Sequence, residues 1–462
     1  MLKYPALLLA LIVGGWLMRR EIRRRPSVSM AIWIPTALVM VLGSRPLSSW
    51  ISGGGQVRSA TLLDQVFLLL ALGAPLIIGS IRGVNWGKFL AANMPLLLLY
   101  AYFAATAIWS QDPAGSAIRI VKDFGLLFVV GLIYSEKEPV QAMRTIFIRC
   151  ACILFPLSIV FNRWFPNFGR DFGMGEVLMH TGVTTQKNSL GEIVWVFSTF
   201  IVWDYIDSIP PARRKGLLQG MPLDYVALLL MGVVLLNESQ SKTSLICLAI
   251  VAALSMRKGA LASGATSAAA FAICLATPFL LFSSKMFGDV IAPIVNALGR
   301  DMTFTGRTNI WDHINATTVN PIIGCGYWTF WQGPGGLEIS KEINWPIPTA
   351  HCGYLDLYLD GGILGLTVFF FALVAYGWRF ISRKGVGRSQ LVGLAMLCAA
   401  IIYNLTESSF VRLGPLWFAT LLMIVAFPQR RKSTAVVKSI YASRIQASPE
   451  ISKSIVARRE WA

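Results

Sequence analysis

Residues 61–80 read TLLDQVFLLLALGAPLIIGS, a run in which Asp64 is the only charged side chain. A helix needs about 20 predominantly apolar residues to cross the hydrocarbon layer of a membrane. This run is long and apolar enough to predict one membrane-spanning helix.

Comparable apolar stretches recur along the chain, near 2–18, 28–44, 61–80, 89–109, 118–134, 145–161, 189–206, 222–237, 243–256, 265–284, 355–376, 389–406 and 413–427. Two of them, 222–237 and 243–256, are short and could form a single re-entrant unit. The pattern predicts an all-α fold, a polytopic transmembrane helix bundle of about 12–14 spans.

The overall composition supports this interpretation. The chain has 462 residues, of which 14% are charged and 55% hydrophobic, and its mean hydropathy is +0.60. A soluble globular protein carries roughly 25% charged residues. So few charges cannot cover a soluble surface, and the same composition excludes a disordered chain and a small disulfide-rich scaffold.

The placement of the basic residues predicts the orientation of the spans. The formal net charge is +18, but Lys and Arg lie in short runs between apolar stretches, unlike the basic face of a nucleic-acid-binding protein. With Arg19–Arg25 placed in the cytoplasm, the cytoplasmic loops hold 26 basic residues and the outside segments hold 12. Cytoplasmic loops of membrane proteins carry such an excess.

On this topology the chain has four parts. We expect N-terminal transmembrane helices over 1–284, a large outside loop over 285–354, C-terminal transmembrane helices over 355–427 and a basic cytoplasmic tail over 428–462. The first stretch is interpreted as a retained anchor, because a basic block follows it where a signal-peptide cleavage site would need small residues.

Four polar clusters lie at the outer ends of the apolar stretches. Their notable residues are Lys187 and Asn188, Lys242, Arg307 and His351. Charge near the hydrocarbon boundary is costly and needs a polar or anionic partner. That partner could be internal, and the candidates are Glu192, Glu238 and Asp356. Together, three cations and an imidazole at one membrane face suit a pyrophosphate head group with a general base beside it.

These residues belong to motifs with a characteristic order. The motifs are Lys187-Asn188, Ser241-Lys242-Thr243, GRTNIW at 306–311, NPIIGCG at 320–326, HCGYL at 351–355 and GILG at 362–365. The series resembles the O-antigen ligase and polysaccharide polymerase superfamily, most closely over about 180–410. Cys352 replaces the usual Asn, Ser or Gln. Lys242 stands where many ligases have Arg. The Ser241-Lys242-Thr243 motif therefore looks more like that of the exopolysaccharide polymerases.

The resemblance implies a membrane glycosyltransferase. It would move a glycan from a polyprenyl-pyrophosphate carrier to a sugar hydroxyl at the periplasmic face of the bacterial inner membrane, polymerising exopolysaccharide repeat units. His351 would be the catalytic base, since an imidazole exchanges protons near neutral pH. The substrate-binding residues would be Arg307, Lys242, Lys187, Asn188 and Arg119.

The resemblance also implies which other molecules take part. We expect no cofactor and no metal, because no Asp-x-Asp motif is present and no nucleotide is needed. The expected partners are the lipid-linked oligosaccharide, a glycan acceptor, membrane lipid and other polysaccharide export proteins, but not nucleic acid.

Several alternatives stay open. A lipid A core acceptor would make the protein an O-antigen ligase. Charges within the apolar stretches, at Arg119, Lys122 and Arg149, are also typical of a transporter or flippase of lipid-linked sugars. Cys325 and Cys352 share the large outside loop and could form a disulfide in an oxidising compartment.

Overall fold

The computed structural model describes residues 2–53, 61–173, 177–208, 220–257, 263–282, 307–382 and 387–427. The predicted tail over 428–462, the first part of the large loop over 285–306 and Gly306 of its GRTNIW motif lie outside these residues. Contacts divide the chain after Val425, and every element named below precedes that point.

The first half of the chain forms helices and one small hairpin. The helices are α1 (Lys3–Arg24), α2 (Trp33–Leu42), α3 (Leu47–Ile51), α4 (Leu62–Ile81), α5 (Trp86–Ala92), α6 (Met94–Ala105), α7 (Pro113–Tyr134), α8 (Pro139–Trp164), α9 (Pro166–Gly169) and α10 (Lys187–Ser208). Strands β1 (Arg170–Phe172) and β2 (Leu178–His180) pair antiparallel, with Asp171 opposite Met179.

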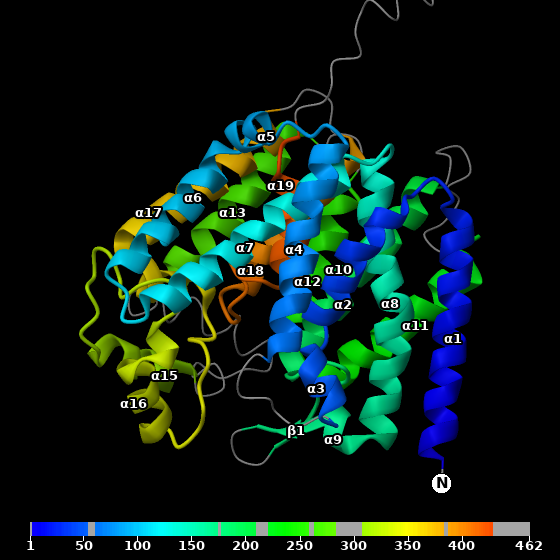
Figure 1. Ribbon diagram of the computed structural model, residues 1–462, viewed down its shortest axis with the longest axis horizontal. Helices are drawn as coiled ribbons and strands as arrows, with labels where there is room; N and C mark the ends of the chain where they lie inside the picture. Colours follow the sequence, from blue (N-terminus) through cyan, green and yellow to red (C-terminus); the bar gives the residue numbers. More distant parts are fainter. Residues whose placement is uncertain are drawn as a thin grey trace, which may run out of the picture. The chain divides into compact units, whose positions relative to one another are not determined.

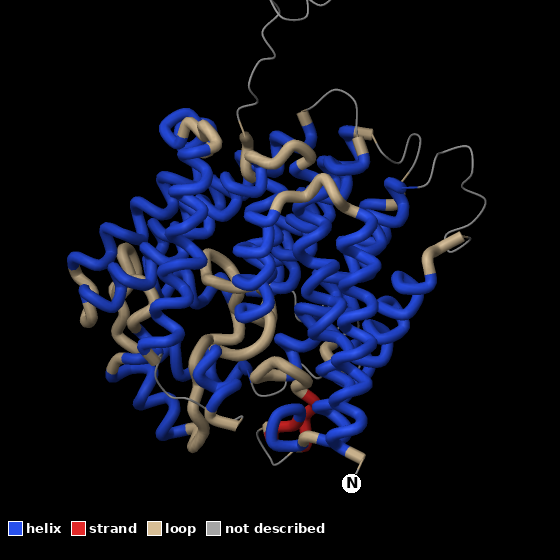
Figure 2. Tube along the Cα trace, turned by 45° about the vertical axis from the view of Figure 1, so that its right-hand side comes forward, coloured by secondary structure: helices blue, strands red, loops and turns tan. Residues whose placement is uncertain are grey.

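In the second half, the regular secondary structure of the described residues is all helical. The helices are α11 (Leu223–Ser239), α12 (Lys242–Ser255), α13 (Gly264–Phe282), α15 (Arg307–Ala316), α16 (Pro334–Glu342), α17 (Gly353–Ile381), α18 (Arg388–Tyr403) and α19 (Pro415–Ile424). Figures 1 and 2 show the almost purely helical bundle, with α15, α16, α9 and β1 toward its lower end in the view of Figure 1. The all-α prediction is confirmed.

Every predicted apolar stretch overlaps a helix, but the helices differ in length. Among the described residues, α4, α8, α10 and α17 are each long and apolar enough to cross a membrane. A fifth span results if α5 and the helix after it, bent by 92°, count as one. Several other apolar helices, such as α2 and α19, are shorter than a full crossing, so the count of 12–14 spans stays a prediction.

The long helices occupy two different environments. In α8 and α10, 83% of the most apolar window is buried inside the protein, and the Phe147 and Phe200 rings of these helices stack 4.0 Å apart. In α4 only 28% of that window is buried, and Leu69, Leu70 and Ile77 are exposed. A soluble protein rarely exposes such a continuous apolar face, so α4 faces lipid while α8 and α10 form the centre of the bundle.

Asp64, the only charge in the run at 61–80, lies in the first turn of α4. Its carboxylate accepts a hydrogen bond from Thr61 N at 3.1 Å, while Thr61 Oγ1 accepts one from Asp64 N at 3.4 Å. The Asp64 carboxylate also accepts hydrogen bonds from the N–H and hydroxyl of Ser48. This capping box satisfies amides that have no partner within the helix.

Helix α17 is broken at Gly362, where φ is +62°. The turn at 320–326 packs into the break. Ile363 N donates to Pro321 O at 2.9 Å, and Cys325 N donates to Leu359 O at 2.9 Å. A Cβ at Gly362 would lie 2.3 Å from the carbonyl group of Ile322. The NPIIGCG and GILG motifs are therefore two halves of one structure, in which the turn satisfies backbone groups that the broken helix cannot satisfy itself.

The predicted cytoplasmic arginines meet at one end of the bundle. Arg25 Nη2 lies 2.6 Å from Asp204 Oδ2, Arg144 Nη1 lies 3.6 Å from Asp204 Oδ1, and Arg388 Nε lies 3.3 Å from Asp207 Oδ1. These residues come from the end of α1, the start of α8, the end of α10 and the start of α18. Their grouping agrees with the predicted orientation of these four helices.

Candidate functional site

The centre of the candidate site is the segment 404–412, which joins α18 to α19. Asn404 fixes its fold, because the Asn404 side-chain oxygen accepts hydrogen bonds from Ser409 N at 2.8 Å and Phe410 N at 3.0 Å. Glu192 of α10 braces the same region by accepting from Ser409 Oγ and from Leu416 N, each at 3.2 Å. A short connection between two apolar helices is thereby held in one conformation.

Two helices reach Glu407 of this segment with side chains from their first turns. Asn188 at the start of α10 donates from Nδ2 to Glu407 Oε1 at 2.7 Å. Arg307, the first residue of α15, donates from Nη2 to the same oxygen at 2.7 Å and from Nη1 to the carbonyl of Thr406. The side chains of Arg307 and Glu407 are each only 9% exposed, so this ion pair is buried.

Two further helices begin at the same segment. Thr243 in the first turn of α12 shares a hydrogen bond of 2.7 Å with the hydroxyl of Thr406. Gly353, the first residue of α17, donates from its amide to Asn404 O at 2.8 Å and to Glu407 O at 2.9 Å. Four helix N-termini thus converge on residues 404–407. Helix N-termini carry partial positive charge and favour anions.

His351 lies just before α17 and faces the other oxygen of Glu407. Its Nδ1 is 3.8 Å from Glu407 Oε2, and its side chain is 24% exposed. The carboxylate is buried, which alone would raise its pKa, but Arg307 and His351 outweigh burial and hold the pKa of Glu407 below its ordinary value. An ionised carboxylate therefore faces Nδ1, and this leaves Nε2 as the nitrogen that can face a substrate hydroxyl.

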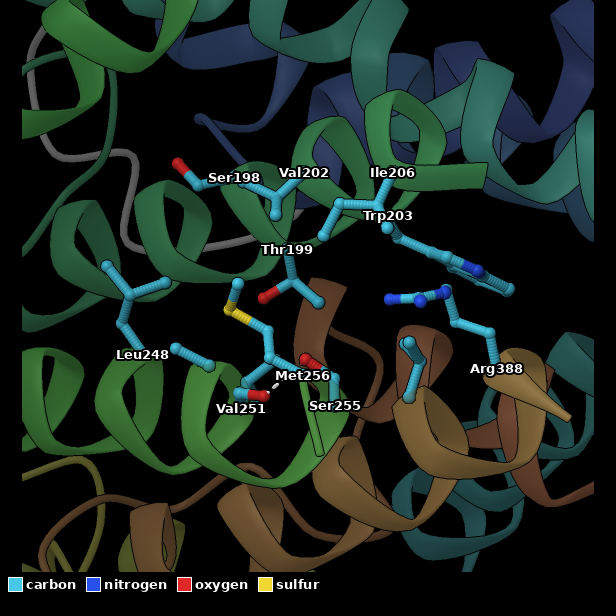
Figure 3. A pocket seen from close by; sticks show the side chains of 12 residues that line it. Ser198, Thr199, Val202, Trp203, Ile206, Leu248, Val251, Ser255, Met256 and Arg388 are labelled. Atoms are coloured by element: carbon cyan, nitrogen blue, oxygen red, sulfur yellow. Dashed lines mark hydrogen bonds between the residues drawn. The ribbon is translucent and has the colours of Figure 1, made fainter. Parts of the chain in front are cut away.

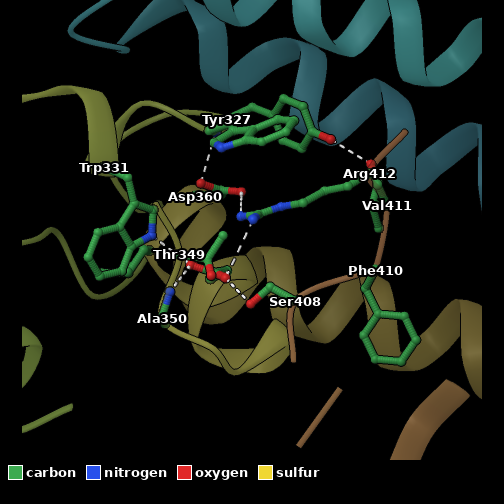
Figure 4. Close-up of polar contacts among 12 residues, drawn as sticks. Tyr327, Trp331, Thr349, Ala350, Asp360, Ser408, Phe410, Val411 and Arg412 are labelled. Atoms are coloured by element: carbon green, nitrogen blue, oxygen red, sulfur yellow. Dashed lines mark hydrogen bonds and ion pairs between the residues drawn. The ribbon is translucent and has the colours of Figure 1, made fainter. Parts of the chain in front are cut away.

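A second ionic network involves Ala350 and Ser408, the chain neighbours of His351 and Glu407 (Figure 4). Asp356 Oδ1 of α17 accepts hydrogen bonds from Trp331 Nε1 at 2.7 Å and Ala350 N at 3.0 Å. Ser408 donates to the other Asp356 oxygen. Because Ala350 precedes His351 and Ser408 follows Glu407, Asp356 fixes the backbone on both sides of the His351–Glu407 contact.

Arg412 completes this second network. Its guanidinium lies 3.5 Å from Asp356 and 3.8 Å from Asp360, and it stacks over the Trp328 ring at 4.7 Å. Burial works against the cation, but Asp356 and Asp360 outweigh it and hold the pKa of Arg412 above its ordinary value. Within the described part of the chain, neither terminal nitrogen of Arg412 makes a hydrogen bond.

The backbone around this site is strained. Trp328, His351 and Val411 have φ values of +53°, +49° and +58°, in the left-handed region that side chains with a Cβ rarely adopt. Gln240, two residues before Lys242, has a φ of +49°. Such conformations cost about 1–3 kcal/mol each and tend to cluster at functional sites.

The structure brings most of the sequence-predicted site residues together. Asn188, Arg307 and His351 all contact Glu407. Lys187 and Lys242 are the first residues of α10 and α12, next to Asn188 and Thr243, and the Lys242 side chain is exposed. The internal-pair alternative holds for Arg307, but its partner is Glu407 rather than one of the three acidic residues proposed from the sequence.

Arg119 lies in a different place. It contacts Asp112 at 3.1 Å, the carbonyl of Trp328 at 3.2 Å and the side chain of Gln332. Arg119 therefore holds the 328–332 segment against α7. Its recorded contacts are with this segment rather than with Glu407, so its role as a substrate-binding residue stays a prediction.

Sequence reasoning missed Glu407 and Arg412. Both lie in NLTESSFVRLG at 404–414, a short connection without a recognisable motif. One signal was available, because an isolated acid and an isolated base between two apolar stretches each need a partner at the membrane boundary. Their partners are far away in the sequence, so the sequence alone did not identify them.

The two loop cysteines are both free thiols. Cys325 Sγ donates to Leu359 O at 3.2 Å, and Cys352 is fully buried as the residue before α17. Burial raises the pKa of each thiol to about 12. Neither is a reactive thiolate, and the suggested disulfide is not present in this structure.

Residues 225–370 match the family model of O-antigen ligase. The chain is also 26% identical over 311 residues to the exopolysaccharide production protein ExoQ of Rhizobium meliloti (strain 1021), and this match covers 63% of the chain and 66% of that protein. The chain is therefore similar to O-antigen ligases and to an exopolysaccharide production protein. It spans just under two thirds of the length of the relative.

The matched ligase region coincides with only part of the site. Residues 225–370 include Lys242, Arg307, His351 and the first part of α17 with its break at Gly362. They exclude Asn188 and Glu407, although the side chain of Glu407 contacts Arg307 and His351. The ligase-like region of this protein is therefore completed by α10 before it and by the 404–412 segment after it.

A cavity elsewhere in the bundle is too small to serve as a lipid site. It has a volume of about 60 Å³ and lies among α10, α12 and α18, with Val251, Leu248 and Trp203 in its wall and Arg388 at its edge (Figure 3). A water molecule occupies roughly 30 Å³ in the liquid. The cavity could hold about two waters, so it does not provide the long apolar cleft that a polyprenyl tail would need.

Proposed function

We propose that this protein moves a glycan from a polyprenyl-pyrophosphate carrier to a sugar hydroxyl, at the membrane face where α10, α12, α15 and α17 begin. The observation that carries the proposal is the convergence of four helix N-termini, Arg307 and His351 on residues 404–407. This arrangement combines positive charge for a pyrophosphate with a general base beside it.

The donor would be held by positive charge at the edge of the site. Lys187 and Lys242 stand at the N-termini of α10 and α12, where side-chain charge and helix dipole add. Arg307 is buried and bound to Glu407, so we assign it an indirect part. It fixes the carboxylate and adds positive charge behind the leaving group.

The chemical step would be a direct displacement. The oxygen of the acceptor hydroxyl attacks the anomeric carbon and forms the new glycosidic bond, while the bond from that carbon to the pyrophosphate oxygen breaks. His351 takes the hydroxyl proton on Nε2, and the electron pair of the broken bond leaves with the polyprenyl pyrophosphate. Glu407 orients the imidazole through Nδ1 and stabilises the imidazolium that forms.

We further propose that the reaction is polymerisation of exopolysaccharide repeat units, at the periplasmic face of a bacterial inner membrane and without a metal. The relative ExoQ supports this choice, since it is an exopolysaccharide production protein. The family match to O-antigen ligase favours a second candidate, transfer to a lipid A core acceptor. The two differ in the acceptor, not in the proposed chemical step.

Transport of a lipid-linked sugar is less well supported by the structure. Arg149, one of the intramembrane charges that suggested a transporter, lies 2.6 Å from Glu21, and both side chains are almost fully buried. Its guanidinium also stacks over Trp33 at 4.6 Å. Arg149 is therefore a neutralised structural charge rather than part of an open pathway.

The test is a transfer assay with the purified full chain in liposomes. Polyprenyl-pyrophosphate-linked repeat units are supplied with EDTA, and the products are separated on a gel. We expect a ladder of polymer that the His351→Ala variant reduces by roughly 10²–10⁴-fold, the usual contribution of a general base, with unchanged insertion and melting temperature.

Other outcomes of the assay discriminate among the candidates. Product only after addition of a lipid A core acceptor would make the protein a ligase. Movement of intact lipid-linked sugar across the bilayer without cleavage of the pyrophosphate bond would make it a transporter. Full activity in His351→Ala would remove His351 as the base.

A further inference from the structure

A second cavity lies toward the C-terminal end of α15, the helix whose first residue, Arg307, contacts Glu407. It has a volume of about 430 Å³ and is bounded by α15, α16 and the turn at 317–325. Arg307 at the start of α15 contacts Glu407, whereas His313 and Ala316 near its end line the cavity. A helix rises 1.5 Å per residue, so six to nine residues place the cavity about 9–14 Å along α15 from the reaction site.

The lining of this cavity has a distinctive chemistry. It combines the carboxylates of Glu338 and Glu342, the polar side chains of Thr317 and Gln111, and the ring of Phe330. Among the described residues that line it there is no lysine or arginine. Glu342 is in contact with His313 Nδ1 at 2.8 Å, which orients its carboxylate. An anionic pyrophosphate or phosphate would be repelled here.

The glycine-rich sequence at 333–336 shapes this cavity. A Cβ at Gly333 would lie 2.5 Å from the side-chain oxygen of Gln111, and a Cβ at Gly335 would lie 2.9 Å from the Phe330 ring. Glycine at 335 allows the start of α16 to lie directly against the Phe330 ring, whereas the end of the flexible Gln111 side chain can shift. The start of α16 therefore lies close to Phe330 and Gln111, and Glu338, one turn into α16, lines the same cavity.

We propose that this cavity is a binding subsite for uncharged or amino sugars of the glycan, outside the reaction centre. The hydroxyls of a sugar donate hydrogen bonds to carboxylates, and the C–H face of the sugar ring packs against an aromatic ring. The proposal rests on the proposed glycan transfer, because a glycan whose reacting sugar lies at His351 would extend along α15 to the cavity. The glycan could belong to the donor or to the acceptor, and the kinetic test below separates them.

The binding test uses the full-length protein in detergent and a lipid-free probe. The probe is the oligosaccharide repeat unit released by mild acid from its pyrophosphate carrier, and binding is measured by saturation-transfer NMR. We expect the wild type and His351→Ala to bind it equally, and Glu338→Ala combined with Thr317→Val to weaken binding at least tenfold. Lys341→Ala is the matched control, since Lys341 lies on α16 but outside the lining.

Transfer kinetics identify which glycan occupies the subsite. The Glu338→Ala/Thr317→Val variant should have the kcat and melting temperature of the wild type, but one KM should rise tenfold. The KM for the donor rises if the donor glycan binds in the cavity. The KM for the acceptor rises if the acceptor glycan binds there. Equal probe binding by this variant and the wild type, or no binding by the wild type, would overturn the subsite. If a tetralysine peptide displaced the probe, the cavity would instead be an acidic surface that binds basic peptides, and the sugar subsite would be overturned.

The two proposals fail in distinguishable ways. If the wild type transfers no glycan but the probe binds and is lost in the Glu338→Ala/Thr317→Val variant, the sugar subsite stands and the proposed reaction falls. If transfer occurs and depends on His351 while this variant is kinetically normal, the reaction stands and the subsite falls.

Discussion

Two groups of buried charges in this protein are built in opposite ways. In the first group, Arg149 Nε lies 2.6 Å and Arg25 Nη1 lies 3.0 Å from the carboxylate of Glu21. Glu21 lies on α1, Arg25 directly follows that helix, and Arg149 lies on α8. In the second group, around the 404–412 segment, the guanidinium of Arg412 lies 3.5 Å from Asp356 and 3.8 Å from Asp360. The first group makes close ion pairs, whereas in the second, within the described residues, neither terminal nitrogen of Arg412 makes a hydrogen bond.

The backbone shows the same contrast. The Glu21 group is carried by regular helices, while the 404–412 region includes the left-handed residues His351, Trp328 and Val411 around its ion pairs. A protein can neutralise buried charge without strain, as it does around Glu21. We infer that the strain around 404–412 serves the proposed reaction, and the predictions below test this difference.

The largest expected effect on stability comes from the Glu21 group. Glu21→Ala leaves Arg149, whose side chain is 4% exposed, without its carboxylate. Removing one partner of a buried pair costs about 3–5 kcal/mol, so we expect a large drop in melting temperature. Transfer activity per folded molecule should stay at the wild-type level.

The double variant Glu21→Leu/Arg149→Leu is the control for this experiment. Replacing both charges with apolar side chains removes the unpaired cation, so most of the lost stability should return. If Glu21→Ala melts normally but loses activity, the Glu21 group belongs to the functional machinery and the contrast drawn above is wrong.

The second prediction concerns Glu407, which we assign as a positioning residue for His351. Glu407→Gln keeps the shape but removes the charge that faces Nδ1, so kcat should fall by roughly 10–100-fold while donor KM changes less. A matched change, Glu192→Gln, also removes a carboxylate that braces this segment but does not face His351. Equal losses of kcat in both variants would reduce Glu407 to a structural role.

The lowered pKa of Glu407 also predicts how the stability of the protein changes with pH. Its pKa in the folded protein is held below its ordinary value of 4.5 by Arg307 and His351, against the effect of burial. The ionised group therefore stabilises the fold above pH 4.5, and this stabilisation is lost as the pH falls through the lowered pKa. The melting-temperature difference between the wild type and Glu407→Gln should be constant at neutral pH and shrink below pH 4.5.

The sequence predicted the helices far better than it predicted the contacts of the site. Apolar runs such as 61–80 contain their own reason to be helical, and each predicted stretch overlaps a helix. The motif order also led to Asn188, Arg307 and His351, which the structure brings to one carboxylate. That carboxylate, Glu407, could not be inferred, because an ion-pair partner is chosen by packing between distant helices.

Backbone strain was equally hidden in the sequence. Nothing in the letters around Trp328, His351 or Val411 indicates a left-handed conformation, since none of them is the Gly or Asn that usually adopts it. The contacts of Arg119 were hidden too. The resemblance suggested substrate binding, which stays a prediction, and the sequence did not indicate its contacts with Trp328 and Gln332.

The third prediction separates charge from shape at the proposed donor site. Lys242 is exposed at the start of α12, so Lys242→Arg should keep most of the activity, whereas Lys242→Gln should raise the donor KM about tenfold, equivalent to ~1.4 kcal/mol of lost binding. High salt should reduce the difference between the wild type and Lys242→Gln. Loss of activity in Lys242→Arg together with normal activity in Lys242→Gln would mean that size, not charge, matters here.

The smallest expected effect tests whether all the strain near the site serves function. Gln240 is exposed and closes α11 with a φ of +49°, where glycine is the favoured residue. Gln240→Gly should stabilise the protein by ~1 kcal/mol, measurable as a higher melting temperature, whereas Gln240→Ala should not. If Gln240→Gly is more stable and equally active, the strain that a ligand must explain is confined to Trp328, His351 and Val411. A more stable variant with weaker donor binding would show that the strained turn also positions Lys242, two residues further on.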